Sequence, residues 1–215
     1  MTTARLISHS ALVDGGSMED GIVYCARVSN PASQHANLNN HRLIRYLIEH
    51  RHWSPFEMTS LCLEVETTRD IARQLLRHRS FSFQEFSQRY AAVTEPPVVR
   101  EARLQDHTNR QNSLETDDEP LRREWTARQE EVSRVARETY EWALENGIAR
   151  EQARAVLPEG NTASRLYVNG TLRSWIHYIE LRSDPGTQKE HRALALACAE
   201  AIRPVFPLIT TFVSA

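Results

Sequence analysis

Apolar residues recur along the chain at spacings that predict both strands and helices. Alternation of apolar and polar positions predicts strands over Arg5–Val13, Thr59–Glu66 and Asn161–Val168. Spacings of three and four residues predict helices, which are, in chain order, Met18–Val28, a helix capped by Asn39 or Asn40 that runs to Glu49, Thr68–Leu76, Leu121–Asn146, Ala149–Val156, Thr171–Leu181 and an Ala-rich helix that ends at Ile202. These elements predict an α+β fold, a single domain over residues 1–215 in which several helices, including a long one in the second half, flank a small central sheet.

Capping residues mark several helix starts. Thr67 with Asp70, and Thr187 with Glu190, have the spacing of a capping box. Thr171 can cap the helix that follows it.

Other boundaries follow from glycine, proline and lost periodicity. Gly147 suits the position just after the long helix, and Gly170 is expected to break the strand before it. Periodicity disappears over residues 94–120, which we expect to form a loop or partly ordered insertion. The long helix should turn its apolar side to the core, and that side comprises Trp125, Val132, Val135, Ala136, Tyr140 and Ala143.

Composition narrows the class of protein. The 215 residues are 40% hydrophobic and 25% charged, which is typical of a globular domain with one sizeable core. A net charge of -2 and a pI near 6.5 argue against a bulk nucleic-acid binder. The three cysteines are far apart, without the spacing of a zinc site. With no apolar run of membrane-spanning length and no signal peptide, a cytoplasmic protein that binds neither membrane nor nucleic acid is expected.

The segment Arg77–Tyr90 combines arginines with a histidine, a carboxylate, a serine and amides. Arg77, His78 and Arg79 fall at the end of a predicted helix, where cations interact favourably with the helix dipole. That interaction accounts for one or two cations but leaves the following Glu85, Ser87 and Arg89 unexplained. Guanidinium groups bind phosphate and carboxylate oxygens through paired hydrogen bonds, so the segment indicates a phosphorylated, planar small molecule.

Other interpretations of these residues are open at this point. Ser87 could be a nucleophile, although a hydroxyl among arginines is more often a phosphate ligand, and we favour that. His50 and His52, with Glu57 nearby, could bind a metal, but a polar helix cap or a ligand edge is the preferred interpretation, and no metal site is predicted. The arginines and nearby aromatics could instead belong to an Arg-rich nucleic-acid-binding module that stacks bases.

The motif Arg77-His78-Arg79, followed after seven residues by Ser87, resembles the signature of flavin-dependent thymidylate synthases. Arg89-Tyr90, the segment His52 to Glu57 and the segment Gly170 to Arg182 resemble further parts of that family. The resemblance covers nearly the whole chain except residues 94–120. Thr171 stands where many members have Asn, and Gln88 where many have Gly.

The resemblance implies roles for individual residues. It implies contacts to FAD from His52, Ser54, Arg77, His78, Arg79, Glu85, Thr171, Leu172, Arg173 and His177. It implies contacts to dUMP from Gln74, Leu75, Leu76, Arg77, Glu85, Phe86, Ser87, Gln88, Arg89, Arg154 and Arg182. Arg182 matches the family's activating arginine and is the expected catalytic residue.

The implied reaction is reductive methylation of dUMP to dTMP. Methylenetetrahydrofolate would donate the carbon and NADPH would reduce the FAD, in a homotetramer whose sites combine several subunits. Uracil C5 becomes nucleophilic only as negative charge builds in the ring, and a fixed guanidinium beside N3 and O2 would stabilise that charge. Such chemistry requires no cysteine nucleophile.

Overall fold

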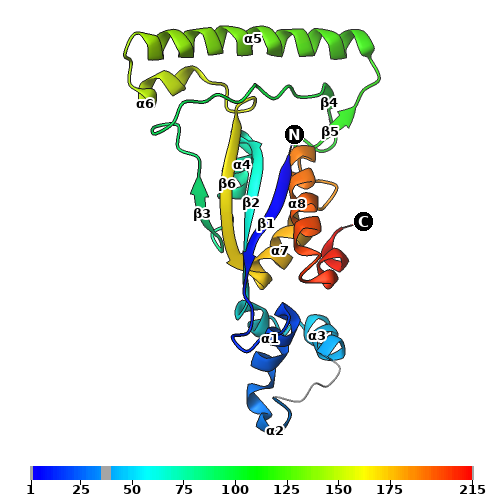
Figure 1. The fold of residues 1–215 in the computed structure, drawn as a ribbon. Coiled ribbons are helices and arrows are strands. Elements are labelled where there is room, and N and C mark those ends of the chain that lie inside the picture. The colour runs from blue at the N-terminus through cyan, green and yellow to red at the C-terminus, as the bar shows by residue number, and fades with distance from the viewer. Residues whose placement is uncertain (1, 35–39, 215) are drawn as a thin grey trace.

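A four-stranded antiparallel sheet organises the fold (Figure 1). The structure is a computed structural model that describes residues 2–34 and 40–214. The strands lie in the order β1 (Thr3–His9), β2 (Ser60–Thr68), β6 (Ala163–Thr171) and β3 (Ser82–Glu85). The predicted α+β class is therefore confirmed. The first strand begins at Thr3 instead of Arg5 and ends at His9 instead of Val13.

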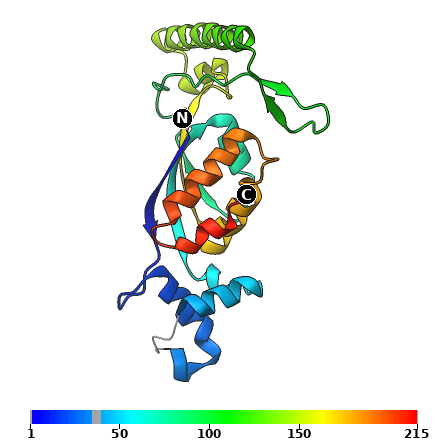
Figure 2. The same cartoon turned by 90° about the vertical axis from the view of Figure 1, so that its right-hand side faces the viewer.

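The two faces of the sheet differ because side chains alternate along each strand. Leu61, Leu63 and Val65 of β2 are buried beneath three helices, which are α4 (Arg69–Leu75), α7 (Leu172–Arg182) and α8 (Lys189–Ile202). Figure 2 shows α8 lying across this covered face. The opposite face carries ion pairs between strands, such as Arg5–Glu64 at 2.9 Å and Arg165–Glu66 at 2.7 Å.

Gly170 does not break β6, contrary to the prediction. It lies inside the strand and pairs with Leu61 of β2. A side chain would not fit at this position, because a Cβ atom built there would lie 2.3 Å from Cδ1 of Phe81. Part of the segment after Arg79 pairs with β6 as β3 and so brings Glu85 to the sheet edge.

The N-terminal helices form a separate group at one end of the molecule (Figure 1). They are α1 (Met18–Ala26), α2 (Pro31–Gln34) and α3 (Asn40–Glu49), with short 3₁₀ turns at Arg27–Ser29 and Ser54–Glu57. Asn39 lies outside the described residues, and Asn40 is the first residue of α3. A 3₁₀ turn at Pro207–Phe212 closes the chain against the main core.

Two predicted capping boxes are wrong and one predicted cap is right. Thr68 rather than Thr67 precedes α4, and its side chain makes no capping bond. Gln188 rather than Thr187 precedes α8, again without a side-chain cap. Thr171 caps α7 by accepting the backbone N–H of Ser174 at 3.2 Å.

Residues 94–120 contain a hairpin where a loop was expected. Its strands are β4 (Arg103–Gln105) and β5 (Ser113–Glu115). Ion pairs hold the segment against the helices, among them Arg100–Asp70 at 2.8 Å and Lys189–Glu115 at 2.7 Å. Ionic contacts of this kind produce no apolar periodicity, which is why the order of this segment was not predicted.

The long helix α5 (Glu119–Glu145) is confirmed, but its orientation corrects the prediction. Tyr140 and Ala143 are buried in a small second cluster with Ala153 of α6 (Arg150–Ala153), which the turn Arg154–Val156 follows. Ala136 is half-buried. The other expected core residues are exposed, namely Trp125, Val132 and Val135 at 43%, 56% and 46%. Gln129 faces inward instead, and its amide bonds both the backbone N–H and the carbonyl of Arg100 at 2.9 Å.

Candidate functional site

Arg182 lies at an open cavity of about 750 Å³. The cavity forms where the ends of α4 and α7 meet the turn before α8. Beside Arg182 it is lined by Gln74, His177, Glu180 and Gln188, and also by Gln111, Leu181, Asp184, Gly186 and Thr187. Gln111 comes from the loop of the β4–β5 hairpin. Of the predicted site residues, the fold therefore brings Gln74, His177 and Arg182 together.

His78 holds the guanidinium of Arg182. Arg182 Nε donates a hydrogen bond to His78 Nε2 at 3.0 Å. Burial and the cation of Arg182 lower the pKa of His78 to about 4. The imidazole is therefore neutral near pH 7, with Nε2 as acceptor and the proton on Nδ1. The bond uses Nε of Arg182 and leaves the two terminal nitrogens for a ligand.

A row of hydrogen-bonded polar side chains lies beside this pair, in which His191 is buried and Gln74, Gln188 and Glu190 are half-buried. Gln74 Nε2 donates to Gln188 Oε1 at 2.7 Å, and Gln188 Nε2 donates to Glu190 Oε2 at 3.0 Å. His191 Nδ1 lies 3.1 Å from Gln74 Oε1. The His191 side chain is fully buried, and its Nε2 has no hydrogen-bond partner among the described residues. Burial and the cation of Arg182 lower the pKa of His191 to about 3.

The residues implied for FAD near α7 form polar contacts of their own. Arg173 makes an ion pair of 2.9 Å with Glu57. His177 packs edge-on against Trp53, with 5.2 Å between ring centroids, and burial, followed by the cation of Arg173, lowers the pKa of its imidazole. The Leu172 side chain is buried in the core, so its side chain cannot face a ligand.

Four further residues implied for FAD, which are His52, Ser54, Arg77 and Arg79, are exposed and polar. Arg77 and Arg79 are exposed at the end of α4, and within the described residues neither forms an ion pair. His52 and Ser54 are exposed after α3. Free guanidinium groups with hydroxyl and imidazole donors are the chemistry that a diphosphate-bearing cofactor requires, so this donor set fits FAD.

A second set of predicted residues lies beyond β3. Glu85 accepts hydrogen bonds from Arg69, Arg73 and Ser164 at 3.3, 3.2 and 2.8 Å. Arg89 pairs with Glu151 at 3.2 Å. Ser87 is half-buried beside Arg89, and the amide nitrogen of buried Gln88 has no partner. Arg154 is half-buried in the turn after α6.

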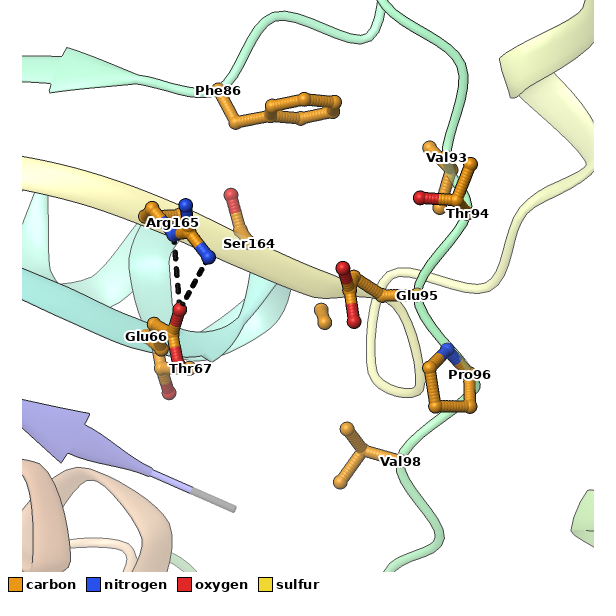
Figure 3. Close-up of a pocket in the computed structure, with 11 residues that line it drawn as sticks. Glu66, Thr67, Phe86, Val93, Thr94, Glu95, Pro96, Val98, Ser164 and Arg165 are labelled. Carbon is orange, nitrogen blue, oxygen red and sulfur yellow. Dashed lines mark hydrogen bonds and ion pairs between the residues drawn. The ribbon is translucent and has the colours of Figure 1, made fainter.

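Phe86 faces a different cavity, of about 320 Å³, between the sheet and the segment from Val93 to Val98 (Figure 3). Arg165 and Glu66, paired at 2.7 Å, line its sheet side. None of Ser87, Arg89 and Arg154 lines the Arg182 cavity. The residues implied for the nucleotide thus occupy separate places on one chain, and the buried Leu75, with the partly buried Leu76, belongs to the core.

Sequence reasoning missed Trp53, Gln188 and His191. The sequence does carry a signal for His191, because it lies on the apolar stripe that includes Leu194, Ala195 and Cys198. A histidine on a buried helix face needs a partner, and Gln74 provides one.

The described residues also limit other chemistry. No group of three His, Cys, Asp or Glu in residues 2–34 and 40–214 could hold a metal. Burial raises the pKa of the thiols of Cys62 and Cys198, which makes both poor nucleophiles. In this part of the chain no helix has the length and apolar character to span a membrane.

The chain is similar to known proteins over nearly its whole length. A family profile described as Thymidylate synthase complementing protein (Thy1) matches residues 6–208. A probable flavin-dependent thymidylate synthase of Paramecium bursaria Chlorella virus 1 is 51% identical over 209 residues, which is 96% of each chain. A flavin-dependent thymidylate synthase of Synechocystis is 48% identical over 200 residues, or 92% of this chain and 91% of the relative.

Solved structures agree with these sequence matches. A UMP/dUMP methylase, PolB from Streptomyces cacaoi bound with 5-Br UMP, superposes with a TM-score of 0.82 at 30% identity, covering 99% of this chain and 95% of that one. Its complex with 5-Br dUMP gives a TM-score of 0.80 at 31% identity. Because the family profile and the two relatives cover nearly the whole chain, the protein belongs to the flavin-dependent thymidylate synthase family and is an FAD-dependent enzyme of thymidylate synthesis.

Proposed function

We propose that the protein converts dUMP to dTMP by reductive methylation, with methylenetetrahydrofolate as carbon donor and NADPH as the reductant of FAD, in the cytoplasm. The observation that carries the proposal is the arrangement of Arg182. Its guanidinium is fixed by a neutral imidazole at the wall of an open cavity, and its terminal nitrogens are left for a ligand.

Arg182 is the expected catalytic residue. A planar guanidinium donates two parallel hydrogen bonds to adjacent acceptors, which matches the N3 and O2 edge of a uracil ring once N3 has lost its proton and become an acceptor. Because the donor is held in place before the reaction, negative charge that develops on that edge is stabilised without reorganisation. His78, as a neutral acceptor, adds no competing charge beside the guanidinium.

The exposed polar residues after α3 and α4, together with Arg173 and His177 of α7, would hold FAD. When bound, FAD supplies the hydride chemistry. Arg77 and Arg79 offer guanidinium donors for its phosphates. Arg173 and His177 carry polar groups on the same helix as Arg182, at about two and a half turns and one and a half turns from it, respectively. Thr171 already uses its hydroxyl as a helix cap, so it offers the cofactor less than a free amide would.

The nucleotide phosphate would be bound by Ser87, Arg89 and Arg154. Since none of the three lines the Arg182 cavity of the same chain, a complete site needs the Arg182 cavity of one subunit and this phosphate set of another. We therefore extend the proposal to a homotetramer with composite sites.

Helix α5 provides a surface for such association. Its exposed apolar residues are Leu121, Trp125, Val132, Val135 and Trp142. They follow one another at intervals of four, seven, three and seven residues, which places them along one seam of a helix. Exposed apolar patches of this kind on a soluble protein mark interaction sites.

The sugar of the substrate, ribose or deoxyribose, requires a direct comparison of UMP with dUMP. PolB is described as a UMP/dUMP methylase, and the chain superposes on it over 99% of its length. UMP is therefore the second candidate substrate. An Arg-rich nucleic-acid-binding module receives no support, because the net charge of -2 and the pI near 6.5 do not suit a polyanionic partner.

The activity is tested with protein reconstituted with FAD under anaerobic conditions. We expect flavin absorbance, and dTMP formation that requires dUMP, methylenetetrahydrofolate and NADPH together, with UMP as the competing substrate. A fully loaded protein that consumes neither nucleotide would refute the proposal.

Association is tested by light scattering. Replacing Val132 and Val135 together by Asp should dissociate the tetramer, because charge would be buried in the apolar seam. Ala127→Asp adds one such charge at an exposed position of α5 outside the seam and is the control. A tetramer that survives the double replacement would exclude the α5 seam as an interface.

A further inference from the structure

We infer that Gln188, Glu190 and His191 fix the orientation of the Gln74 amide so that it presents an N–H donor to the Arg182 cavity. They would thereby select a pyrimidine with a carbonyl, rather than an amino group, at the edge that Gln74 contacts. The inference rests on the proposed function and adds three positioning residues to its site.

The direction of each hydrogen bond follows from Glu190, whose carboxylate only accepts. The contact from Gln188 to Glu190 at 3.0 Å must therefore come from the Gln188 amide nitrogen. The Gln188 oxygen then faces Gln74 at 2.7 Å, so the Gln74 nitrogen must donate there. This leaves the Gln74 oxygen toward His191, whose Nδ1 must be the donor at 3.1 Å.

Glu190 and His191, at the two ends of this row, are held in the protonation states that these hydrogen-bond directions require. Arg103 donates to Glu190, and Arg100 lies 3.5 Å from the same oxygen. Burial alone would raise the pKa of Glu190, but the hydrogen bonds, led by that from Arg103, outweigh it and lower the pKa. His191 is fully buried and neutral, and with its proton on Nδ1 the unpartnered Nε2 is a bare acceptor.

The consequence is that Gln74 and Arg182 both present N–H donors to the same cavity. Gln74 Nε2 carries two N–H groups, of which Gln188 takes one, and Gln74 lines the cavity together with Arg182. Uracil presents two carbonyl oxygens on either side of N3 and suits two sets of donors. Cytosine replaces one carbonyl by an amino group, which would set a donor against the Gln74 donor and leave both unpaired.

The test measures the ratio of the dissociation constants of dCMP and dUMP by equilibrium dialysis of the FAD-loaded protein with labelled nucleotides. We expect the wild type to prefer dUMP by at least ~100-fold, because sites built on hydrogen bonding reject analogues strongly. Gln188→Leu and His191→Leu each free the Gln74 amide to rotate and should reduce this ratio about tenfold, which corresponds to one lost neutral hydrogen bond. His191→Gln keeps a side-chain donor and should restore most of the preference.

The control is Cys198→Ala, which changes packing on the same buried face of α8 without touching the row, and its ratio should equal that of the wild type. If the Leu variants fold, bind dUMP and keep the wild-type ratio, the three residues have only a structural role and the inference is overturned. If the FAD-loaded wild type binds other ligands selectively but does not bind dUMP, the proposed function itself is overturned, and the inference with it.

Discussion

Gly170→Ala tests the packing between the central sheet and the signature segment. The added Cβ would lie 2.3 Å from Cδ1 and 2.6 Å from Cε1 of Phe81, distances at which something must move. Phe81 is nearly buried, and its ring lies 4.5 Å from the ring of Trp175 and 5.8 Å from that of Tyr178. The ring therefore has no free space into which it can retreat.

The size of the effect follows from this geometry. An ordinary carbon contact requires about 3.5 Å, so the ring or the strand must shift by roughly 1 Å. Overpacking of a well-filled core typically costs about 1–3 kcal/mol, and we expect Gly170→Ala to lower the free energy of unfolding by that amount. Because the backbone N–H of Phe81 bonds the carbonyl of His78 at 3.2 Å, displacement of Phe81 should also disturb the His78–Arg182 pair and lower turnover.

The assay is urea denaturation at one fixed protein concentration, for the wild type, Gly170→Ala, Phe81→Val and the double variant. Phe81→Val removes both clashing ring carbons, so adding Gly170→Ala to it should cost little. The coupling energy between the two positions is expected to be about 1–3 kcal/mol. Equal destabilisation by Gly170→Ala in both backgrounds would refute the steric explanation.

Three further predictions concern individual side chains. Arg182→Lys should keep fold and flavin but lose about a hundredfold or more in dTMP formation, while NADPH oxidation without nucleotide changes far less; near wild-type dTMP formation would reduce Arg182 to a helix-end charge. Lowering the pH from about 6.5 to about 4 should destabilise the protein, because the unfolded chain binds protons at His78 and His191 that the folded state, with pKa values of about 4 and about 3, does not. The stability that comes from keeping both imidazoles neutral is present above pH 6.5 and is lost on acidification. His191→Leu should therefore reduce the slope of the unfolding free energy against pH by up to ~1.4 kcal/mol per pH unit. An unchanged slope would contradict the buried neutral state of His191. Ser87→Ala should weaken dUMP binding yet retain turnover at saturating substrate, and a folded, saturated variant without turnover would indicate a serine nucleophile.

Much of the fold was predictable because its elements carry strong apolar periodicity. The alternation of Leu61, Leu63 and Val65 identified β2, and the length of α5 was evident. The side of α5 that faces inward was not predictable, since its apolar seam is exposed and Gln129 faces inward. Periodicity shows that a helix has an apolar side but does not show whether its own chain or another chain covers that side.

The candidate site was predictable at the level of motifs and less so at the level of contacts. The family resemblance located Gln74, His78 and Arg182. Gln74 and Arg182 line one cavity, and Arg182 donates a hydrogen bond to His78. Gln188 could not be found this way, because its role depends on a tertiary contact with Gln74 across 114 positions of the chain. The separation of Ser87 from the cavity likewise appears only in three dimensions.

The small size of the cluster beneath α5 has a consequence for how the subunit folds. Among the described residues, the buried apolar side chains of this cluster are Tyr140, Ala143 and Ala153, whereas α5 has 27 residues and is about 40 Å long. This small amount of buried apolar surface cannot by itself hold a helix of this length in place. In a single chain, α5 should therefore open locally at a low cost in free energy. In the proposed tetramer, amide hydrogens of α5 would exchange quickly in dilute solution and slowly at concentrations at which the subunits associate, and completion of this helix would be a concentration-dependent, late step of assembly.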